Sequence, residues 1–182
     1  MSNSIGRQPA WYGRHAVSAA PRGRKAVGLI GWLVVTAAAG ALGAIASIDA
    51  ARFYGELAQP AWAPPAWLFG PVWMVLYAMM AVAAWTVWKV RGWQGAAASL
   101  GLYLAQLVAN ALWTWLFFAW HQGAWALVDI ALLWALVALT AWRFSHVRPA
   151  AGALLLPYLA WLGFAAMLNF TLWQMNPQLL GG

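Results

Sequence analysis

One apolar stretch of the sequence, residues 99–119, carries polar and aromatic side chains at helical spacing. They are Tyr103, Gln106, Asn110, Trp113 and Phe117. Their intervals of three and four residues place all five on one face of a helix. Tyr and Trp rings can stack on a flat molecule, and amide groups can fix its orientation. This face therefore predicts one wall of a small-molecule site.

Two other apolar stretches carry similar faces. Trp73 and Tyr77 are one helical turn apart within residues 66–88. Pro157 lies at the start of the face within residues 150–174, where we expect it to loosen the helix. Polar groups inside a bilayer are costly unless they are satisfied, so these faces should point into a helix bundle. The face in the second stretch consists of Tyr158, Trp161, Ala165 and Asn169.

The alternative interpretation is that these side chains only pack helices together, since Asn and Gln can bond between helices at about 0.6 kcal/mol each. For any single residue, helix packing explains its presence as well as a ligand site does. The convergence of all the faces at one depth of the membrane favours the ligand site.

Several chemistries have no suitable residues. His15, His121 and His146 lie in the tail or in loops, so no imidazole is expected at the depth of the site to ligate a haem iron. The chain has no cysteine, and neither a Ser-His-Asp set nor a phosphate loop can be assembled. Asp129 is the only acid inside an apolar stretch; it could pair with Arg52, cap backbone groups or take part in proton chemistry. We expect no metal site and no required cofactor.

The composition places these faces in a membrane. The 182 residues are 65% hydrophobic and 7% charged, which a water-soluble fold could not accommodate. Each of five apolar stretches is long enough to cross a hydrocarbon core of about 30 Å. The sequence therefore predicts an all-α integral membrane protein with five transmembrane helices. The predicted spans are residues 27–48, 66–88, 99–119, 124–143 and 150–174.

The basic residues predict the orientation of these spans. Nine of the ten Lys and Arg residues fall in the N-terminal segment and in the second and fourth loops, and only Arg52 falls elsewhere. The positive-inside rule then places the N-terminus in the cytoplasm, so the net charge of +7 reflects orientation and not nucleic-acid binding. We divide the chain into a basic tail (1–26), a membrane domain (27–176) and a short C-terminal tail (177–182). An alternative for the first span is a signal peptide cleaved near Ala46.

The first loop, residues 49–65, is the longest connection. Pro60, Pro64 and Pro65 fix their own φ angles and bias their neighbours to extended backbone, so the loop should be stiff and non-helical. It could act as a lid over the site. It could also be a turn in which Trp62 and Trp67 anchor the chain at the headgroup level.

Several motifs of the sequence resemble those of a known protein family. The motifs that carry the resemblance are Tyr54, Pro60-x-Trp62-x-Pro64-Pro65-x-Trp67, Val72-Trp73, Leu76-Tyr77, Tyr103-x-x-Gln106-Leu107-x-x-Asn110-x-x-Trp113-x-x-x-Phe117-Phe118, Ala126-Leu127-x-Asp129 and Pro157-Tyr158-Leu159-x-Trp161-x-x-Phe164-x-x-x-Leu168-Asn169. Together they resemble the translocator protein or tryptophan-rich sensory protein family (TspO/MBR) over about residues 28–176. Sixteen Trp residues suit that name.

The resemblance implies a five-helix bundle, often a homodimer, that binds porphyrins, sterols and benzodiazepine-type drugs in a pocket capped by the first loop. It also implies possible light-dependent degradation of protoporphyrin, with Trp73 and Trp161 involved. A bacterial inner membrane is the expected location, because apolar helices suit it better than an outer membrane built for barrels. Carried over position by position, the implied ligand-binding residues are Tyr54, Trp62, Trp73, Tyr77, Asn110, Trp113, Trp161 and Ala165.

The sequence departs from the family pattern near its C-terminus. Animal members carry a cholesterol-recognition pattern that needs a Tyr followed by Lys or Arg, whereas Phe170 and Gln174 stand at those positions here. This departure argues against tight sterol binding and leaves porphyrin binding open. Gly101, Ala105 and Ala109 form a stripe of small residues that could serve a homodimer interface.

Overall fold

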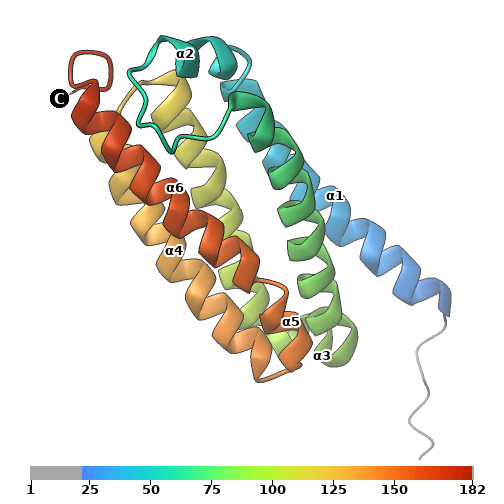
Figure 1. The fold of residues 1–182 in the computed structure, drawn as a ribbon. Coiled ribbons are helices and arrows are strands. Elements are labelled where there is room, and N and C mark those ends of the chain that lie inside the picture. Colours follow the sequence, from blue (N-terminus) through green and yellow to red (C-terminus); the bar gives the residue numbers. More distant parts are fainter. Residues whose placement is uncertain (1–21, 182) are drawn as a thin grey trace, which may run out of the picture.

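The structure, a computed structural model, describes residues 22–181, and this part of the chain is helical without any strand (Figure 1). The predicted all-α membrane fold is confirmed. The elements are α1 (Arg22–Ala46), α2 (Ala50–Glu56), the 3-10 turn η1 (Ala66–Leu68), α3 (Phe69–Thr114), the π-helical turn η2 (Trp115–Ala119), α4 (Gly123–Ser145), α5 (Pro149–Ala153) and α6 (Leu156–Met175).

Helix α3 contains two of the five predicted spans. The continuous run Ala66–Ala119 has 54 residues and would be about 80 Å long if straight, more than twice the thickness of a hydrocarbon core. The run instead folds back where Gly92 has φ +67° and Ala96 has φ −131°. Glycine adopts the left-handed conformation without a steric penalty, so the turn forms there. The two limbs, residues 69–91 and 97–114, lie antiparallel within the bundle (Figure 1).

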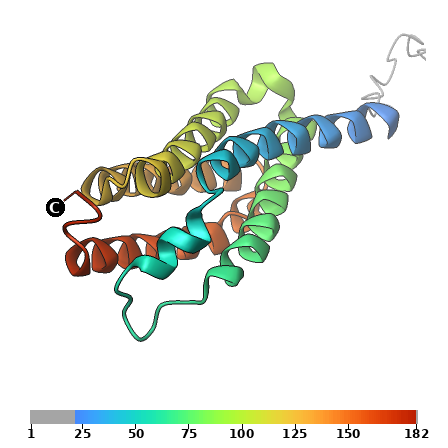
Figure 2. The ribbon, with the colours of Figure 1, turned by 90° about the horizontal axis from the view of Figure 1, so that it is seen from above.

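The connections gather at two opposite ends of the bundle (Figures 1 and 2). The α2 end holds α2, the connection between η2 and α4, and the C-terminus. The α5 end holds the start of α1, the turn of α3 and α5. Lys25, Lys89, Arg91, Arg143 and Arg148 belong to elements at the α5 end, whereas Arg52 lies at the α2 end. The positive-inside rule therefore predicts that the α5 end faces the cytoplasm.

The helix boundaries correct the predicted ones by a few residues. Helix α1 begins at Arg22, so the last residues of the predicted basic tail are helical, and residues 1–21 lie outside the described part of the chain. The fifth predicted span is interrupted, because α5 ends at Ala153 and α6 begins at Leu156. Pro157 lies in the first turn of α6, where proline is favoured, so it begins the helix and does not loosen it.

The described helices bury two hydrophobic clusters, a large one along the bundle and a smaller one that includes Phe53 and Leu180, and they expose an apolar surface. Helix α1 approaches α3 so closely that a Cβ on Gly28 would lie 2.1 Å from the Trp88 ring. Across the bundle, the completely buried side chains include Met80, Tyr103 and Phe144. Large apolar side chains such as Ile30 and Val108 are more than half exposed. A lipid environment accommodates that surface, since lipid tails are as apolar as these side chains.

Candidate ligand-binding site

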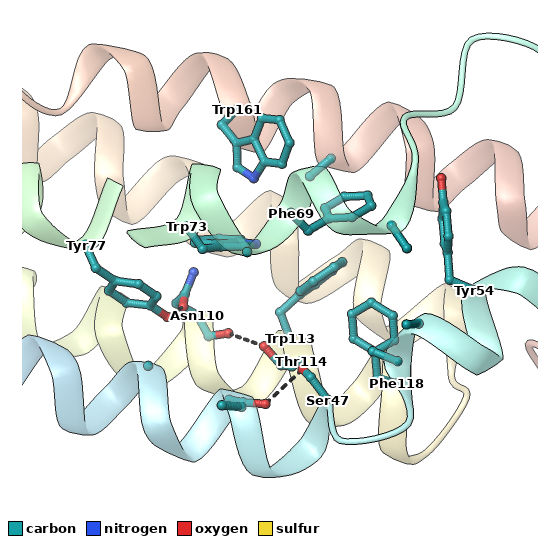
Figure 3. A pocket seen from close by; sticks show the side chains of 18 residues that line it. Ser47, Tyr54, Phe69, Trp73, Tyr77, Asn110, Trp113, Thr114, Phe118 and Trp161 are labelled. Atoms are coloured by element: carbon teal, nitrogen blue, oxygen red, sulfur yellow. Dashed lines mark hydrogen bonds between the residues drawn. The ribbon is translucent and has the colours of Figure 1, made fainter. Parts of the chain in front are cut away.

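A cavity of about 360 Å³ lies between α1, α2, both limbs of α3, and α6. Its size falls within the range of about 300–1,000 Å³ that is usual for small-molecule sites. Figure 3 shows aromatic rings entering it from several helices. The residues that line it are Gly40, Gly43, Ala44, Ser47, Ala50, Ala51, Tyr54, Ala66, Phe69, Gly70, Trp73, Tyr77, Asn110, Trp113, Thr114, Phe118, Trp161 and Ala165.

Seven of the eight predicted ligand-binding residues lie in the wall of this one cavity. Trp62 is the exception, because its ring packs edge-on against Phe164 with centroids 5.9 Å apart and does not reach the lining. Phe164 in turn contacts Trp161 at 5.4 Å. Trp62 is therefore two side chains away from the cavity. The seven residues in the wall are Tyr54, Trp73, Tyr77, Asn110, Trp113, Trp161 and Ala165.

Asn110 lies between two tyrosines at the deep end of the cavity. Its Oδ1 accepts a hydrogen bond from the Tyr77 hydroxyl, and its Nδ2 donates to the Tyr158 hydroxyl at 2.8 Å. Tyr158 is completely buried on α6. One amide therefore joins both limbs of α3 to α6, and it leaves neither tyrosine hydroxyl without a partner.

Trp113 is held in the wall by a second set of hydrogen bonds. Its Nε1 donates to Oδ1 of Asn169 at 3.2 Å, and Nδ2 of Asn169 donates to the backbone oxygen of Gly123 at 2.9 Å. The Trp113 ring also stacks on Phe117, with centroids 5.5 Å apart and planes 13° apart. These contacts fix the ring from its edge and from one face.

Trp161 contrasts with Trp113, because its Nε1 is buried without a hydrogen-bond partner among the described residues. Figure 3 shows the Trp161 side chain pointing from α6 toward Phe69 and Trp73. The Phe69 and Trp161 rings meet edge-on with centroids 5.9 Å apart. The wall therefore presents an aromatic surface here, while the indole N–H of Trp161 is buried without a partner among the described residues.

The cavity is electrically neutral, since none of the described residues that line it is charged. Its hydroxyl groups are already engaged within the protein. Thr114 donates to the backbone oxygen of Asn110 at 3.3 Å, and Ser47 donates to that of Gly43 at 3.0 Å (Figure 3). Tyr54 donates to the oxygen of Pro64 at 3.0 Å. Such a site suits binding of a largely apolar molecule, and these groups do not form a nucleophile and base pair.

The α1 wall and Phe118 were not among the predicted ligand-binding residues. Gly40, Gly43 and Ala44 face the cavity, but small residues in an apolar helix give no distinctive signal. Phe118 is brought to the wall by the π-helical turn η2, which shifts the helical register after Thr114. Cleavage near Ala46, the alternative for the first span, would remove the α1 residues from the wall.

The acidic, histidine and basic side chains of the described residues are absent from the lining. Arg52 pairs with Glu56 at 3.0 Å, so the predicted alternative of an Arg52–Asp129 pair is wrong. Asp129 is buried on α4, and its Oδ2 has no partner in the described part of the chain. His121 stacks on Phe53 at the α2 end, whereas His146 bonds the Trp142 oxygen at the α5 end.

Comparison with known proteins relates this sequence to one family. The model of the TspO/MBR family matches residues 32–174, a segment that contains every residue of the cavity lining. The chain is 45% identical over 127 residues to "Translocator protein" of Bos taurus, which covers 69% of this chain and 75% of that protein. It is 42% identical over 130 residues to "Tryptophan-rich protein TspO" of Chlorobaculum tepidum, covering 70% and 82% respectively. It is 38% identical over 148 residues to "Protein CrtK" of Rhodobacter capsulatus, covering 80% and 91%.

Proposed function

Because the chain belongs to the TspO/MBR family of multi-pass membrane proteins, we propose that it is a receptor, sensor or transporter for porphyrins such as protoporphyrin IX. Similar flat hydrophobic molecules would bind in the same cavity. The observation that carries this proposal is the aromatic lining of a neutral cavity bordered by α1, α2, α3 and α6.

In the proposed complex, stacking of the planar ligand on aromatic side chains supplies the main attraction. Phe69, Trp73 and Trp161 come from two helices and lie around the same space (Figure 3). Each stacked or edge-on pair with a planar ligand contributes about 0.5–1.5 kcal/mol beyond the burial of apolar area. Two or three such pairs give a flat ring system a preference over a flexible chain of equal area.

The neutral lining also limits which part of a porphyrin can enter. A carboxylate that leaves water without a cation or donors is strongly disfavoured, and the described lining offers no cation. The ring system therefore occupies the cavity, while the propionate groups remain toward the aqueous end. A metal-free ring suits the lining better than haem, because none of the described lining residues is a histidine.

A second candidate function is the oxidative breakdown of a bound porphyrin in light. Trp73 and Trp161 both line the cavity, so either indole could donate an electron to an excited porphyrin beside it. Dissolved dioxygen would be the oxidant that then attacks the porphyrin radical, and it would carry away the electrons that the ring loses. Under this hypothesis the same site serves binding and chemistry. Illumination of the bound complex separates the two functions, because binding alone requires no light.

We propose the partners and location on the same basis. The bilayer surrounds the protein, with a bacterial inner membrane as the location, and no cofactor is required for binding. A homodimer could form through the stripe predicted from the sequence, where Gly101 and Ala105 are exposed and Ala109 is buried. Small exposed residues permit close approach of two helices.

Protoporphyrin IX titration of the purified protein in detergent tests the proposal. Bound porphyrin should quench tryptophan fluorescence saturably, because several Trp rings line the site. Folded protein whose fluorescence does not change on titration would refute the proposed function.

A further inference from the structure

The C-terminal residues 176–181 form a compact turn that packs on the α2 end of the bundle; we call it the C-terminal cap. The backbone N–H groups of Leu179 and Leu180 donate to the oxygen of Asn176 at 3.1 and 3.0 Å. The Leu180 side chain is completely buried. This segment was predicted to be a short tail, but its described residues are packed against the bundle.

Asn176 joins the cap to the first loop. Its Oδ1 accepts from the backbone N–H of Ala58 at 2.8 Å, and its Nδ2 donates to the backbone oxygen of Ala58 at 2.9 Å. The same Nδ2 donates to the oxygen of Leu172 at 2.8 Å, which fixes the amide on the last turn of α6. Asn176 is 7% exposed, so water competes little for these bonds.

The bonded segment, residues 57–65, connects α2 to η1; we call it the capping loop. Its flanking residues Tyr54 and Ala66 line the cavity. Tyr54 also donates to Pro64 at 3.0 Å, so the loop is tied near both of its ends. Burial raises the pKa of Tyr54 above its usual value of 10.0, and the phenol therefore remains a donor at neutral pH.

The cap also bonds the first residue of α4. The oxygen of Leu180 accepts from the backbone N–H of Gly123 at 3.0 Å. The oxygen of Gly123 accepts from Asn169, which holds Trp113 in the cavity wall. The cap is thus bonded to the first loop and to the start of α4, and each of these leads to a residue of the lining.

We propose that Asn176 is a positioning residue that holds the capping loop beside the cavity and limits the rate at which ligand enters and leaves. The inference rests on the proposed function, because it concerns exchange at the same cavity. Asn176 does not line the cavity, so its removal changes the restraint on the loop and leaves the ligand contacts in place.

The experiment compares wild type with Asn176→Ala and with a control, Gln174→Ala, at an exposed residue in the last turn of α6. Stopped-flow tryptophan fluorescence with protoporphyrin IX gives both rate constants. We expect Asn176→Ala to raise association and dissociation rates together by roughly tenfold, which corresponds to about 1.4 kcal/mol, with a smaller change in Kd. Gln174→Ala should match wild type. Asn176→Asp, which keeps the acceptor for Ala58 and loses the donor, should fall between them.

Hydrogen exchange at the Ala58 amide supplies a readout that needs no ligand. Its protection should be lost in Asn176→Ala and kept in Gln174→Ala. Faster exchange at Ala58 together with unchanged porphyrin rates would overturn the positioning role alone. An increase in Kd through dissociation only, with association unchanged, would also overturn it, because a loop restraint acts on both rates. Absence of porphyrin binding to wild type would overturn the proposed function and this inference with it.

Discussion

Asn110 donates a hydrogen bond of 2.8 Å to the hydroxyl of Tyr158, which joins the cavity to the buried core of α6. The same amide accepts from Tyr77 on the other limb of α3. The Asn110 side chain thus provides hydrogen-bond partners for tyrosine hydroxyls on two neighbouring segments. We therefore expect replacement of Asn110 to change both the stability of the fold and the shape of the cavity.

Replacing Asn110 with Ala should lower both the stability of the fold and its affinity for porphyrin. The buried hydroxyl of Tyr158 and the partly buried hydroxyl of Tyr77 would lose their partner, at about 1–3 kcal/mol of folding free energy. Porphyrin affinity should fall about tenfold as Tyr77 becomes free to move. Thermal unfolding and fluorescence titration measure the two effects. Tyr103→Phe is the matched control, since it removes a buried 2.6 Å bond to Thr36 away from the lining. It should reduce stability and leave affinity unchanged, and equal affinity losses in both variants would contradict the role of Asn110.

The two tryptophans Trp113 and Trp161 should respond differently to replacement by Phe. Trp113→Phe removes a used N–H donor and should destabilise the protein by about 1 kcal/mol. Trp161→Phe removes a donor without a partner among the described residues, so stability should change little. Porphyrin affinity should fall because the smaller Phe ring offers less surface for stacking, by less than the roughly 0.5–1.5 kcal/mol of a whole aromatic pair. Unfolding and binding measurements on both variants check this contrast. A larger loss of stability in Trp161→Phe than in Trp113→Phe would show that the indole of Trp161 is engaged within the protein.

The α1 wall can be tested with two glycines of the same helix. A Cβ on Gly40 would lie 3.2 Å from the Tyr77 ring, whereas a Cβ on Gly31 would meet nothing within 4 Å. Gly40→Leu should therefore occupy part of the cavity and weaken porphyrin binding at least tenfold. Gly31→Leu should leave binding unchanged and favour the helix by about 0.5–1 kcal/mol. Titration of both variants with protoporphyrin IX measures this difference. If folded Gly40→Leu binds porphyrin with the affinity of wild type, the ligand binds outside this cavity.

Light-dependent breakdown of porphyrin depends on the tryptophans of the lining. If Trp161 donates an electron to the excited porphyrin, Trp161→Phe should slow the loss of the Soret band in illuminated samples with saturated sites. Trp125→Phe is the control, because Trp125 is 63% exposed on α4 and absent from the lining. Equal bleaching rates in both variants, in wild type and in empty detergent would assign the bleaching to the porphyrin alone.

The periodic faces could be predicted from the sequence because side chains three and four residues apart must share a helical face. Asn110 with Trp113, and Trp161 with Ala165, reached the same cavity for this reason. Gly40 and its neighbours carry no polar or aromatic signal, so their place in the wall emerged only from the packing of α1. The position of Trp62 against Phe164 depends on the path of an irregular loop, which spacing does not determine.

The hydrogen bonds between Asn176 and Ala58 could not be predicted from the sequence either. The two residues are 118 positions apart, and neither belongs to a periodic pattern. Their contact depends on where α6 ends relative to the first loop, which is a property of the assembled bundle. The motifs of the resemblance stop at Asn169, so they gave no indication of this bond.

The decisive measurement is equilibrium binding of protoporphyrin IX in the dark, compared among wild type, Asn110→Ala and Trp161→Phe. We expect saturable binding to wild type and weaker binding to both variants, each shown to be folded by its thermal unfolding transition. Binding of equal strength to all three proteins would contradict the assignment of the porphyrin to this cavity, and no binding to folded wild type would contradict the proposed ligand.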